Sequence, residues 1–273
     1  MQVTASSGVG NADADEGQLW NGGRPAAIDM HGISMLPRPF LTIALLLACL
    51  GSAAAQGGPG ARVRVDQRVA PWSSIGKLQA VAGSLRITCT GALVGPRLVL
   101  SAAHCLYNPR TQKFFLPASL HFVMALQGQD FTAAALADRL QVAPDFEPAT
   151  PLRTAGSDWA LITLPVAVPD ARLVLSTAPL PPAEGTRIDV GGYAQDNPNV
   201  LTADLDCRVL GFARDALGRR LIRHDCATTH GVSGAPLLAR TDSGWTVVGI
   251  NVARSTSGAL GLAAPLEAVP LPR

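Results

Sequence analysis

Short apolar segments interrupted by turn residues constrain the fold of this 273-residue chain more than any other feature. The segments are often β-branched, and Gly, Pro, Asn or Asp separates each from the next; they include 87–89, 98–100, 121–126, 159–164, 187–190, 236–238 and 245–252. Such closely spaced turn signals are typical of an all-β sandwich or barrel and not of alternating βα units. Residues 131–142 fit a helix by propensity, although strand and loop suit their position equally well. The sequence therefore predicts an all-β fold.

Residues 35–55 have the composition of a secretory signal peptide. Arg38 supplies a positive flank, an apolar run extends from Leu41 to Leu50, and three alanines ending at Ala55 match a small-residue cleavage site. The apolar run is too short to cross a bilayer, so we expect no stable membrane span. We expect cleavage after Ala55 and a secreted or periplasmic protein.

Two features of the N-terminal region leave alternatives open. Residues 1–34 are polar and glycine-rich, which indicates either an upstream start-site error, with Met30 or Met35 as the true initiator, or a disordered extension. The residues that end at Cys49 loosely match a bacterial lipoprotein box, although Leu47 fits that pattern poorly. A lipidated N-terminus at Cys49 is therefore the alternative to cleavage after the alanines.

The cysteine content agrees with export. Without Cys49, four cysteines remain, at positions 89, 105, 207 and 226, and an even number suits an oxidising compartment. Of the three possible pairings we favour Cys89–Cys105 and Cys207–Cys226, because each pair brackets a candidate reactive residue or its approach. Each short loop would contribute on the order of 3 kcal/mol in the chain-entropy model. No cysteine pair has the C-x2-C spacing that is typical of a zinc site, so we do not expect one.

The charge distribution gives no indication of nucleic-acid binding. The formal net charge is +2, and the chain has no long basic run. The cluster of Arg219, Arg220 and Arg223 is expected to be the solvated flank of a hairpin.

A proline-rich stretch divides the chain into two halves. Prolines 165, 169, 179, 181 and 182 fall between residues 165 and 184. Proline stiffens a connector and donates no hydrogen bond to a sheet, so we expect an interdomain crossover at 166–184. The crossover would join an N-terminal domain, residues 62–165, to a C-terminal domain, residues 185–267.

Ser233 is a candidate nucleophile. It lies in Gly231-Val232-Ser233-Gly234, where glycine on both sides permits a backbone that exposes the hydroxyl and directs amide N–H groups to one point. The N–H groups of Gly231 and Ser233 would form an oxyanion hole. A serine between glycines also occurs in ordinary turns, so this pattern needs partners elsewhere in the chain.

His104 and Asp158 are the candidate partners. His104 follows a strand-like run and precedes Cys105, which suits a general base held on a short turn. Asp158 introduces the apolar strand 159–164, where a carboxylate is costly unless it is hydrogen-bonded. It would orient the histidine and stabilise its imidazolium. Asp145 is the rival acid but lies in a polar turn.

On these residues the chain resembles the chymotrypsin-fold, trypsin-like serine endopeptidases from about Val65 to Leu266. The family's histidine, aspartate and serine motifs are similar to 101–105, 158–161 and 231–236, in the family's order. The resemblance implies two six-stranded antiparallel β-barrels with the active site in the cleft between them. It also implies a His104–Asp158–Ser233 triad, protein or peptide substrates, a monomer, and neither cofactor nor metal. The order counts against an α/β-hydrolase, in which the serine comes first and the histidine last.

The second half is similar to the bacterial glutamyl-endopeptidase-like branch, with departures in the predicted substrate pocket. Thr228 is retained, but Asn251 stands where glutamate-specific enzymes carry a histidine, which puts glutamate preference in doubt. Ala227 at the pocket base offers no charge for Lys or Arg, and Arg254 would either favour acidic side chains or narrow the entrance. Val232 replaces the acid that binds a new N-terminus in the animal enzymes, so that activation switch is not expected.

Two alternatives complete the sequence-based account. A catalytically silent homologue that acts as a binding module is the alternative function, although all three candidate triad residues are retained. His230 and His224 lie near Ser233 in sequence, but His104 already supplies a base, so we expect His230 to be a loop residue.

Overall fold

The computed structural model describes residues 61–168, 170, 174–178, 181–255 and 260–271. The predicted extension at 1–34, the signal peptide at 35–55 and the lipoprotein alternative at Cys49 lie outside the described residues. Within the described part of the chain, no helix is long and apolar enough to cross a membrane.

Strands and short 3-10 helices make up the regular structure of the described residues. The strands are β1 (Val63–Arg64), β2 (Ile75–Ala82), β3 (Leu85–Gly95), β4 (Leu98–Ser101), β5 (Tyr107–Asn108), β6 (Lys113–Phe114), β7 (Leu120–Met124), β8 (Ala133–Leu136), β9 (Arg139–Val142), β10 (Ala160–Thr163), β11 (Ser176–Thr177), β12 (Arg187–Gly192), β13 (Thr202–Arg214), β14 (Arg220–His224), β15 (Pro236–Thr241), β16 (Gly244–Arg254) and β17 (Gly261–Pro265). The 3-10 helices are η1 (Trp72–Ser74), η2 (Ala103–Leu106), η3 (Pro117–Ser119), η4 (Pro151–Ser157) and η6 (Leu266–Ala268).

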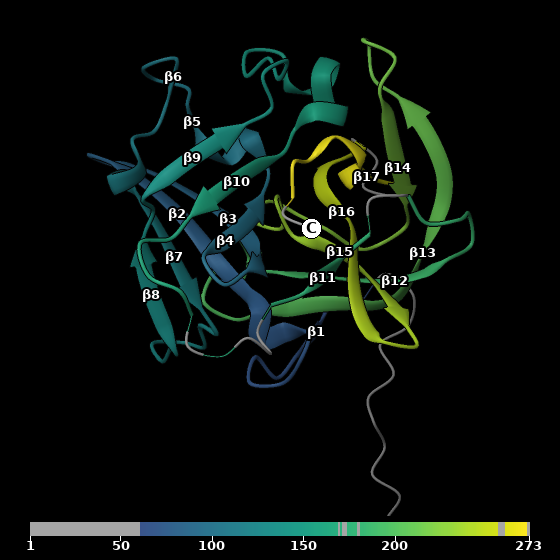
Figure 1. The fold of residues 1–273 in the computed structure, drawn as a ribbon, viewed down its shortest axis with the longest axis horizontal. Helices are drawn as coiled ribbons and strands as arrows, with labels where there is room; N and C mark the ends of the chain where they lie inside the picture. Colours follow the sequence, from purple (N-terminus) through teal and green to yellow (C-terminus); the bar gives the residue numbers. More distant parts are fainter. Residues whose placement is uncertain (1–60, 169, 171–173, 179–180, 256–259, 272–273) are drawn as a thin grey trace, which may run out of the picture. The chain divides into compact units, whose positions relative to one another are not determined.

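The N-terminal sheet is antiparallel and has the strand order β8-β7-β2-β3-β4-β10-β9. It curls on itself in the blue and teal part of the ribbon (Figure 1). The two-residue turn between β2 and β3 contains Gly83 with φ of 58°, a left-handed conformation that glycine adopts without steric cost. This turn sets the register in which Ala82 pairs with Leu85.

The C-terminal sheet closes into a barrel. Its order is β13-β12-β15-β16-β17-β14, and β13 also pairs with β14, which completes a ring of six antiparallel strands. Two short strands join its outside: β1 pairs antiparallel with β13, and β11 pairs parallel with β16. This barrel is the green and yellow part of the ribbon (Figure 1).

The predicted all-β, two-barrel fold is confirmed, with differences in detail. The N-terminal sheet has seven strands and is curled, whereas the prediction was a barrel of six. Residues 131–142, for which the sequence left helix, strand and loop open, form β8 and β9. The segment 62–65, placed in the N-terminal domain by sequence, contributes β1 to the C-terminal sheet.

Buried apolar side chains fill the interior of each sheet. In the N-terminal sheet Leu93, Leu120 and Ile162 have no exposed surface, and in the C-terminal barrel the same holds for Ile222 and Leu237. Burial of one such side chain is worth about 1.5–3 kcal/mol, so these alternating strand positions supply most of the driving force for folding.

The two sheets are held against each other by buried polar contacts as well as by apolar packing. The fully buried Tyr193, which follows β12, accepts a hydrogen bond of 2.9 Å from the N–H of Leu126 in the N-terminal half. Gly191 packs against the ring of Trp72, where an added Cβ would lie 2.5 Å from a ring carbon. The site described below lies where the two halves meet.

Candidate active site

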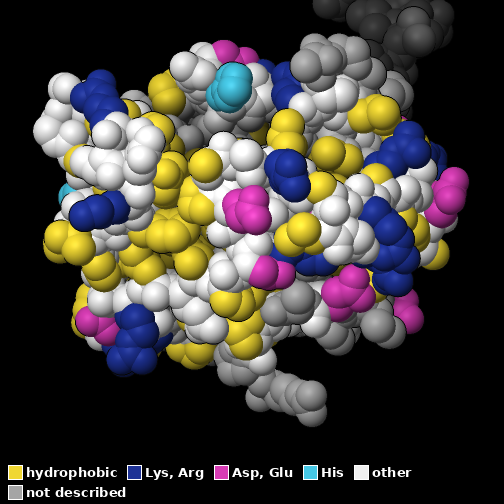
Figure 2. Space-filling model, turned by 90° about the horizontal axis from the view of Figure 1, so that it is seen from above, with side chains coloured by type: hydrophobic (Ala, Val, Ile, Leu, Met, Phe, Trp, Pro, Cys, Tyr) yellow, Lys and Arg dark blue, Asp and Glu magenta, His cyan; other side chains and the backbone are white. Residues whose placement is uncertain are grey.

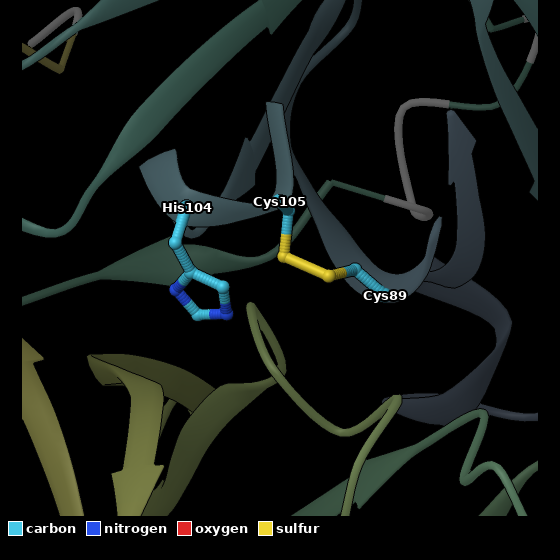
Figure 3. A group of neighbouring side chains, drawn as sticks. All are labelled: Cys89, His104 and Cys105. Carbon is cyan, nitrogen blue, oxygen red and sulfur yellow. A yellow bond between two sulfur atoms is a disulfide. The ribbon is translucent and has the colours of Figure 1, made fainter. Parts of the chain in front are cut away.

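His104 lies in the short helix η2, directly after β4. The disulfide between Cys89 and Cys105 ties this turn to β3, and Figure 3 shows the histidine ring extending from the turn toward the olive ribbon of the C-terminal barrel. One ring nitrogen lies within 4.8 Å of both sulfur atoms. The backbone and the disulfide together therefore fix where the imidazole is presented.

Asp158 makes two contacts with His104. One carboxylate oxygen accepts a hydrogen bond of 2.9 Å from the backbone N–H of His104, and the other lies 2.6 Å from ring atom Nδ1. The strand pairing explains the proximity, because β10 begins two residues after Asp158 and pairs Ala160 with Ser101 of β4. The aspartate is only 2% exposed, and these two hydrogen bonds offset the cost of burying its carboxylate.

The environment of the imidazole changes its affinity for protons. Burial lowers the pKa of His104, but the charge of Asp158 and its hydrogen bond to the ring outweigh burial, and the net pKa is raised above 6.5. A proton on Nδ1 is donated to Asp158, which leaves Nε2 of the neutral ring as an acceptor. The ring is thus prepared to take up a proton at Nε2.

Asp145, the rival acid, is bonded elsewhere. Its carboxylate accepts a hydrogen bond from Nη1 of Arg219, and its side chain is 53% exposed. The carboxylate that contacts His104 is therefore that of Asp158.

Ser233 lies in the loop between β14 and β15, and four consecutive carbonyl groups of this loop accept hydrogen bonds. The carbonyl of His230 accepts from the N–H of Gln195 at 2.7 Å. The carbonyl of Gly231 accepts from the hydroxyl of Thr90, and the carbonyl of Ser233 accepts from the N–H of Thr90, each at 2.8 Å. The carbonyl of Val232 accepts from the side-chain amide of Asn251 at 3.1 Å. A partner therefore orients each of the four peptide planes between His230 and Gly234.

Alternate backbone N–H groups of the same loop donate to protein acceptors. The N–H of Val232 donates to Thr229 and that of Gly234 to Asn251. Within the described part of the chain, the N–H groups of Gly231 and Ser233 donate to no protein acceptor. Because C=O and N–H of a trans peptide point to opposite sides, the bound carbonyls direct these two N–H groups away from the packed face of the loop. Both remain available to a ligand.

Gly231 could not be replaced by another residue in this loop. Its φ is 90°, and an added Cβ would lie 2.3 Å from the carbonyl oxygen of Tyr193. The close approach of the segment after β12 is what allows Gln195 to hold the preceding carbonyl. The sequence pattern of flanking glycines thus has a direct structural cause.

A cavity of about 330 Å³ brings the candidate residues together; it is lined by His104, Thr228, Thr229, His230, Ser233, Asn251, Val252, Ala253 and Arg254. Three of the four residues predicted for the substrate pocket are among them. The fourth, Ala227, does not line the cavity; its N–H donates to the buried Asp204 at 2.6 Å. No lining residue carries a carboxylate.

The remaining histidines and Val232 have distinct environments. His230 is exposed at the rim of the cavity, whereas His224 is fully buried in the C-terminal barrel. Burial lowers the pKa of His224 to about 4, so this ring stays neutral near pH 7. Val232 is 1% exposed and packs in the apolar core of the C-terminal barrel.

Arg219 differs from the solvated hairpin flank that the sequence predicted for the arginine cluster. Arg219 is 21% exposed and bonds Asp145, Asp215 and the hydroxyl of Ser157. Arg220 lies 3.6 Å from Glu267. Through Arg219, the hairpin turn between β13 and β14 is therefore bound to the segment that precedes Asp158. Local sequence patterns do not predict these contacts, because the partners are far apart in the chain.

The clusters of potential metal ligands in the described residues offer no metal site. The two clusters of metal-ligand type in the described residues each contain two disulfide-bonded cysteines, which have no thiolate to offer. On the face in Figure 2, Lys and Arg side chains lie among Asp and Glu side chains.

Comparisons with known proteins identify the fold and the family. Residues 89–250 match the family model of the trypsin-like peptidase domain. A solved Glu endopeptidase in complex with MPD is 21% identical, with a TM-score of 0.62 over 77% of this chain and 93% of its own. A thermostable serine protease from an extremophilic microorganism is 18% identical, with a TM-score of 0.55 over 71% of this chain and 91% of its own. No curated protein sequence matches. The family model spans more than half of the chain, and the chain belongs to the trypsin-like peptidase family.

Proposed function

We propose that this protein is a secreted serine endopeptidase that hydrolyses peptide bonds through an acyl-enzyme intermediate. The observation that carries the proposal is that His104, bonded to the buried Asp158, lines the same cavity as Ser233. A base with an orienting acid beside a serine hydroxyl is the arrangement that nucleophilic acyl transfer requires.

In the first step Ser233 Oγ attacks the carbonyl carbon of the scissile bond while Nε2 of His104 takes up the hydroxyl proton. Asp158 keeps the proton of the neutral ring on Nδ1 and stabilises the imidazolium that forms. The imidazolium then gives its proton to the leaving amine as the C–N bond breaks. Water attacks the resulting ester by the same route, which releases the acid product and restores the serine.

The N–H groups of Gly231 and Ser233 would stabilise the negative oxygen of the tetrahedral intermediate. Their support comes from the bound carbonyls of His230 and Val232, which leave these two donors directed away from protein acceptors. One such donor is typically worth about 10²–10³ in turnover.

The cavity supports only a coarse proposal about the residue before the scissile bond. Without a carboxylate in the lining, a preference for Lys or Arg has no electrostatic basis. Arg254 at the cavity would either favour an acidic side chain or narrow the entrance. Cleavage-site profiling on a peptide library, read by mass spectrometry, distinguishes these outcomes.

Export is part of the proposal. The two disulfides and the peptidase family suggest an extracellular protein that acts on protein or peptide substrates. We propose that residues 35–55 are a signal peptide cleaved after Ala55, and that the mature protein is a monomer. N-terminal sequencing of the exported protein tests the cleavage site and the alternative at Cys49, and gel filtration tests the monomer.

Hydrolysis of casein by the exported protein is the experiment that tests the function. The wild-type protein should release peptides, and His104→Ala should release none while unfolding at a similar temperature. An inactive wild-type protein, folded and with both disulfides formed, would instead support the silent binding module.

A further inference from the structure

Thr90 is a polar side chain with no exposed surface, placed where the two halves of the molecule meet. It lies in β3, directly after the disulfide-bonded Cys89, and so belongs to the N-terminal sheet. A buried hydroxyl is costly unless it is hydrogen-bonded. Its partners therefore indicate what the residue does.

Those partners belong to the serine loop and to the segment after β12. The hydroxyl donates to the carbonyl of Gly231 at 2.8 Å and accepts from the N–H of Tyr193 at 3.0 Å. The backbone N–H of Thr90 donates to the carbonyl of Ser233 at 2.8 Å. Its carbonyl accepts from the hydroxyl of Ser101, three residues before His104, at 2.7 Å. Thr90 thus contacts the loop that carries Ser233 and the strand that leads to His104.

Two glycines keep this contact tight. An added Cβ at Gly192 would lie 2.6 Å from the hydroxyl oxygen of Thr90, and one at Gly234 would lie 2.3 Å from its carbonyl oxygen. At both positions the backbone of the C-terminal half therefore packs directly against Thr90, with no side chain between them. In addition, a β-branched side chain has few χ1 rotamers, which limits the directions that the hydroxyl can take.

We propose that Thr90 is a positioning residue that fixes the oxyanion-binding loop through its hydroxyl. The bond to the carbonyl of Gly231 orients the peptide plane between Gly231 and Val232, which joins the two planes that carry the proposed oxyanion donors. The bond from Tyr193 ties the same hydroxyl to the segment whose Gln195 holds the carbonyl of His230. This inference rests on the proposed function.

Substitution separates the hydroxyl from the volume of the side chain. Thr90→Val keeps the shape but leaves the carbonyl of Gly231 and the N–H of Tyr193 without a partner. Thr90→Ser keeps the hydroxyl. Thr90→Ala serves as a second comparison with Thr90→Ser, since both lack the methyl group. Thr202→Val is the control, because Thr202 Oγ1 is buried and has no hydrogen-bond partner among the described residues.

The readouts are kcat and KM on a quenched peptide that the wild-type protein cleaves, and the inhibition constant of a peptide aldehyde. Ser233 Oγ adds to the aldehyde carbon, its proton passes to His104, and the former carbonyl oxygen becomes the oxyanion. The matching peptide alcohol, which forms no such adduct, reports ground-state binding. A displaced donor typically costs on the order of 10² in rate.

We expect Thr90→Val to lower kcat about 100-fold and to leave KM within about 2-fold of wild type. The inhibition constant of the aldehyde should rise by about the same factor as kcat falls, whereas binding of the alcohol should not change. Thr90→Ser and Thr202→Val should stay within about 5-fold of wild type, and Thr90→Ala should match Thr90→Val. Equal activity of the Thr90→Ser and Thr90→Ala proteins would overturn the inference, even if Thr90→Val does not fold. A wild-type protein without activity would overturn the proposed function instead.

Discussion

Asp158 binds His104 through both of its carboxylate oxygens, one at the backbone N–H at 2.9 Å and one at Nδ1 of the ring at 2.6 Å. The first bond fixes the turn that carries the histidine, and the second fixes the ring on that turn. A carboxylate with 2% exposure is strongly coupled to such a partner. Position and protonation of the candidate base therefore depend on the same residue.

Replacing Asp158 by Asn should lower turnover and shift the pH profile. The wild-type kcat/KM should rise with pH, with a midpoint above 6.5, because Asp158 raises the pKa of His104 despite burial and the base acts only when neutral. In Asp158→Asn only the effect of burial remains, so the midpoint should fall, and kcat should drop on the order of 10³–10⁴-fold. An unchanged midpoint in a folded variant would argue against this coupling.

Replacing Asn251 should reduce turnover on every substrate and not change specificity. Its side-chain amide donates to the carbonyl of Val232, and its backbone bonds Gly234 and Ala235. Asn251→Leu removes the donor at similar volume, so kcat should fall about 10–100-fold with the same cleavage-site profile. If profiling on the peptide library shows a changed preference with kcat preserved on the best substrate, Asn251 is a specificity residue only.

Replacing Arg219 should destabilise the segment that leads to Asp158. Asp215, whose side chain is fully buried, bonds both the guanidinium of Arg219 and the N–H of Gly156. Arg219→Met leaves this carboxylate without its cation, which should lower the free energy of unfolding by about 2–4 kcal/mol in urea titrations.

The matched control is Arg220→Met. Arg220 lies 3.6 Å from Glu267, and both side chains are about 40% exposed. Its loss should cost about 1 kcal/mol or less. Equal losses for the two variants would show that Arg219 is an ordinary surface residue.

His224 should make the fold sensitive to acid. Burial lowers its pKa to about 4 in the folded protein, whereas the unfolded chain takes up the proton near 6.5. The unfolded state therefore binds more protons between these values, so stability falls as the pH drops from 6.5 to 4, by up to about 3 kcal/mol. Below pH 4 both states are protonated and this contribution changes no further.

Urea titrations across that range, with two variants, check the assignment. His224→Leu should show a shallower loss of stability between pH 6.5 and 4 than wild type. The control His121→Gln, at an exposed position of β7, should keep the wild-type slope. Parallel slopes for all three proteins would rule out His224 as the cause.

Local patterns in the sequence predicted the parts of the site that local chemistry decides. Each candidate residue was recognised from its sequence neighbours: the histidine lies beside Cys105, the acid precedes an apolar strand, and the serine lies between glycines. The disulfides Cys89–Cys105 and Cys207–Cys226 are present, with the pairing that was favoured because each pair brackets a candidate reactive residue or its approach.

The contacts that hold these parts together could not be predicted from one sequence. Thr90 and Gly231 are separated by 141 residues, and Arg219 and Asp145 by 74. Such pairs depend on how two sheets pack, and nothing in the residues around Thr90 distinguishes it from other strand threonines. For the same reason the pairing of β1 with the C-terminal sheet was missed, since a two-residue strand has no periodicity.

The most direct test of the account is labelling of the exported protein with a fluorophosphonate, in which Ser233 Oγ would displace fluoride from phosphorus. Mass spectrometry of the digested protein should find the adduct on Ser233, and Ser233→Ala should take up no label while it remains folded. His104→Ala should react far more slowly than wild type, because the hydroxyl then lacks its base. Label that persists in Ser233→Ala, or that resides on another residue of the wild-type protein, would contradict the assignment of Ser233 as the nucleophile.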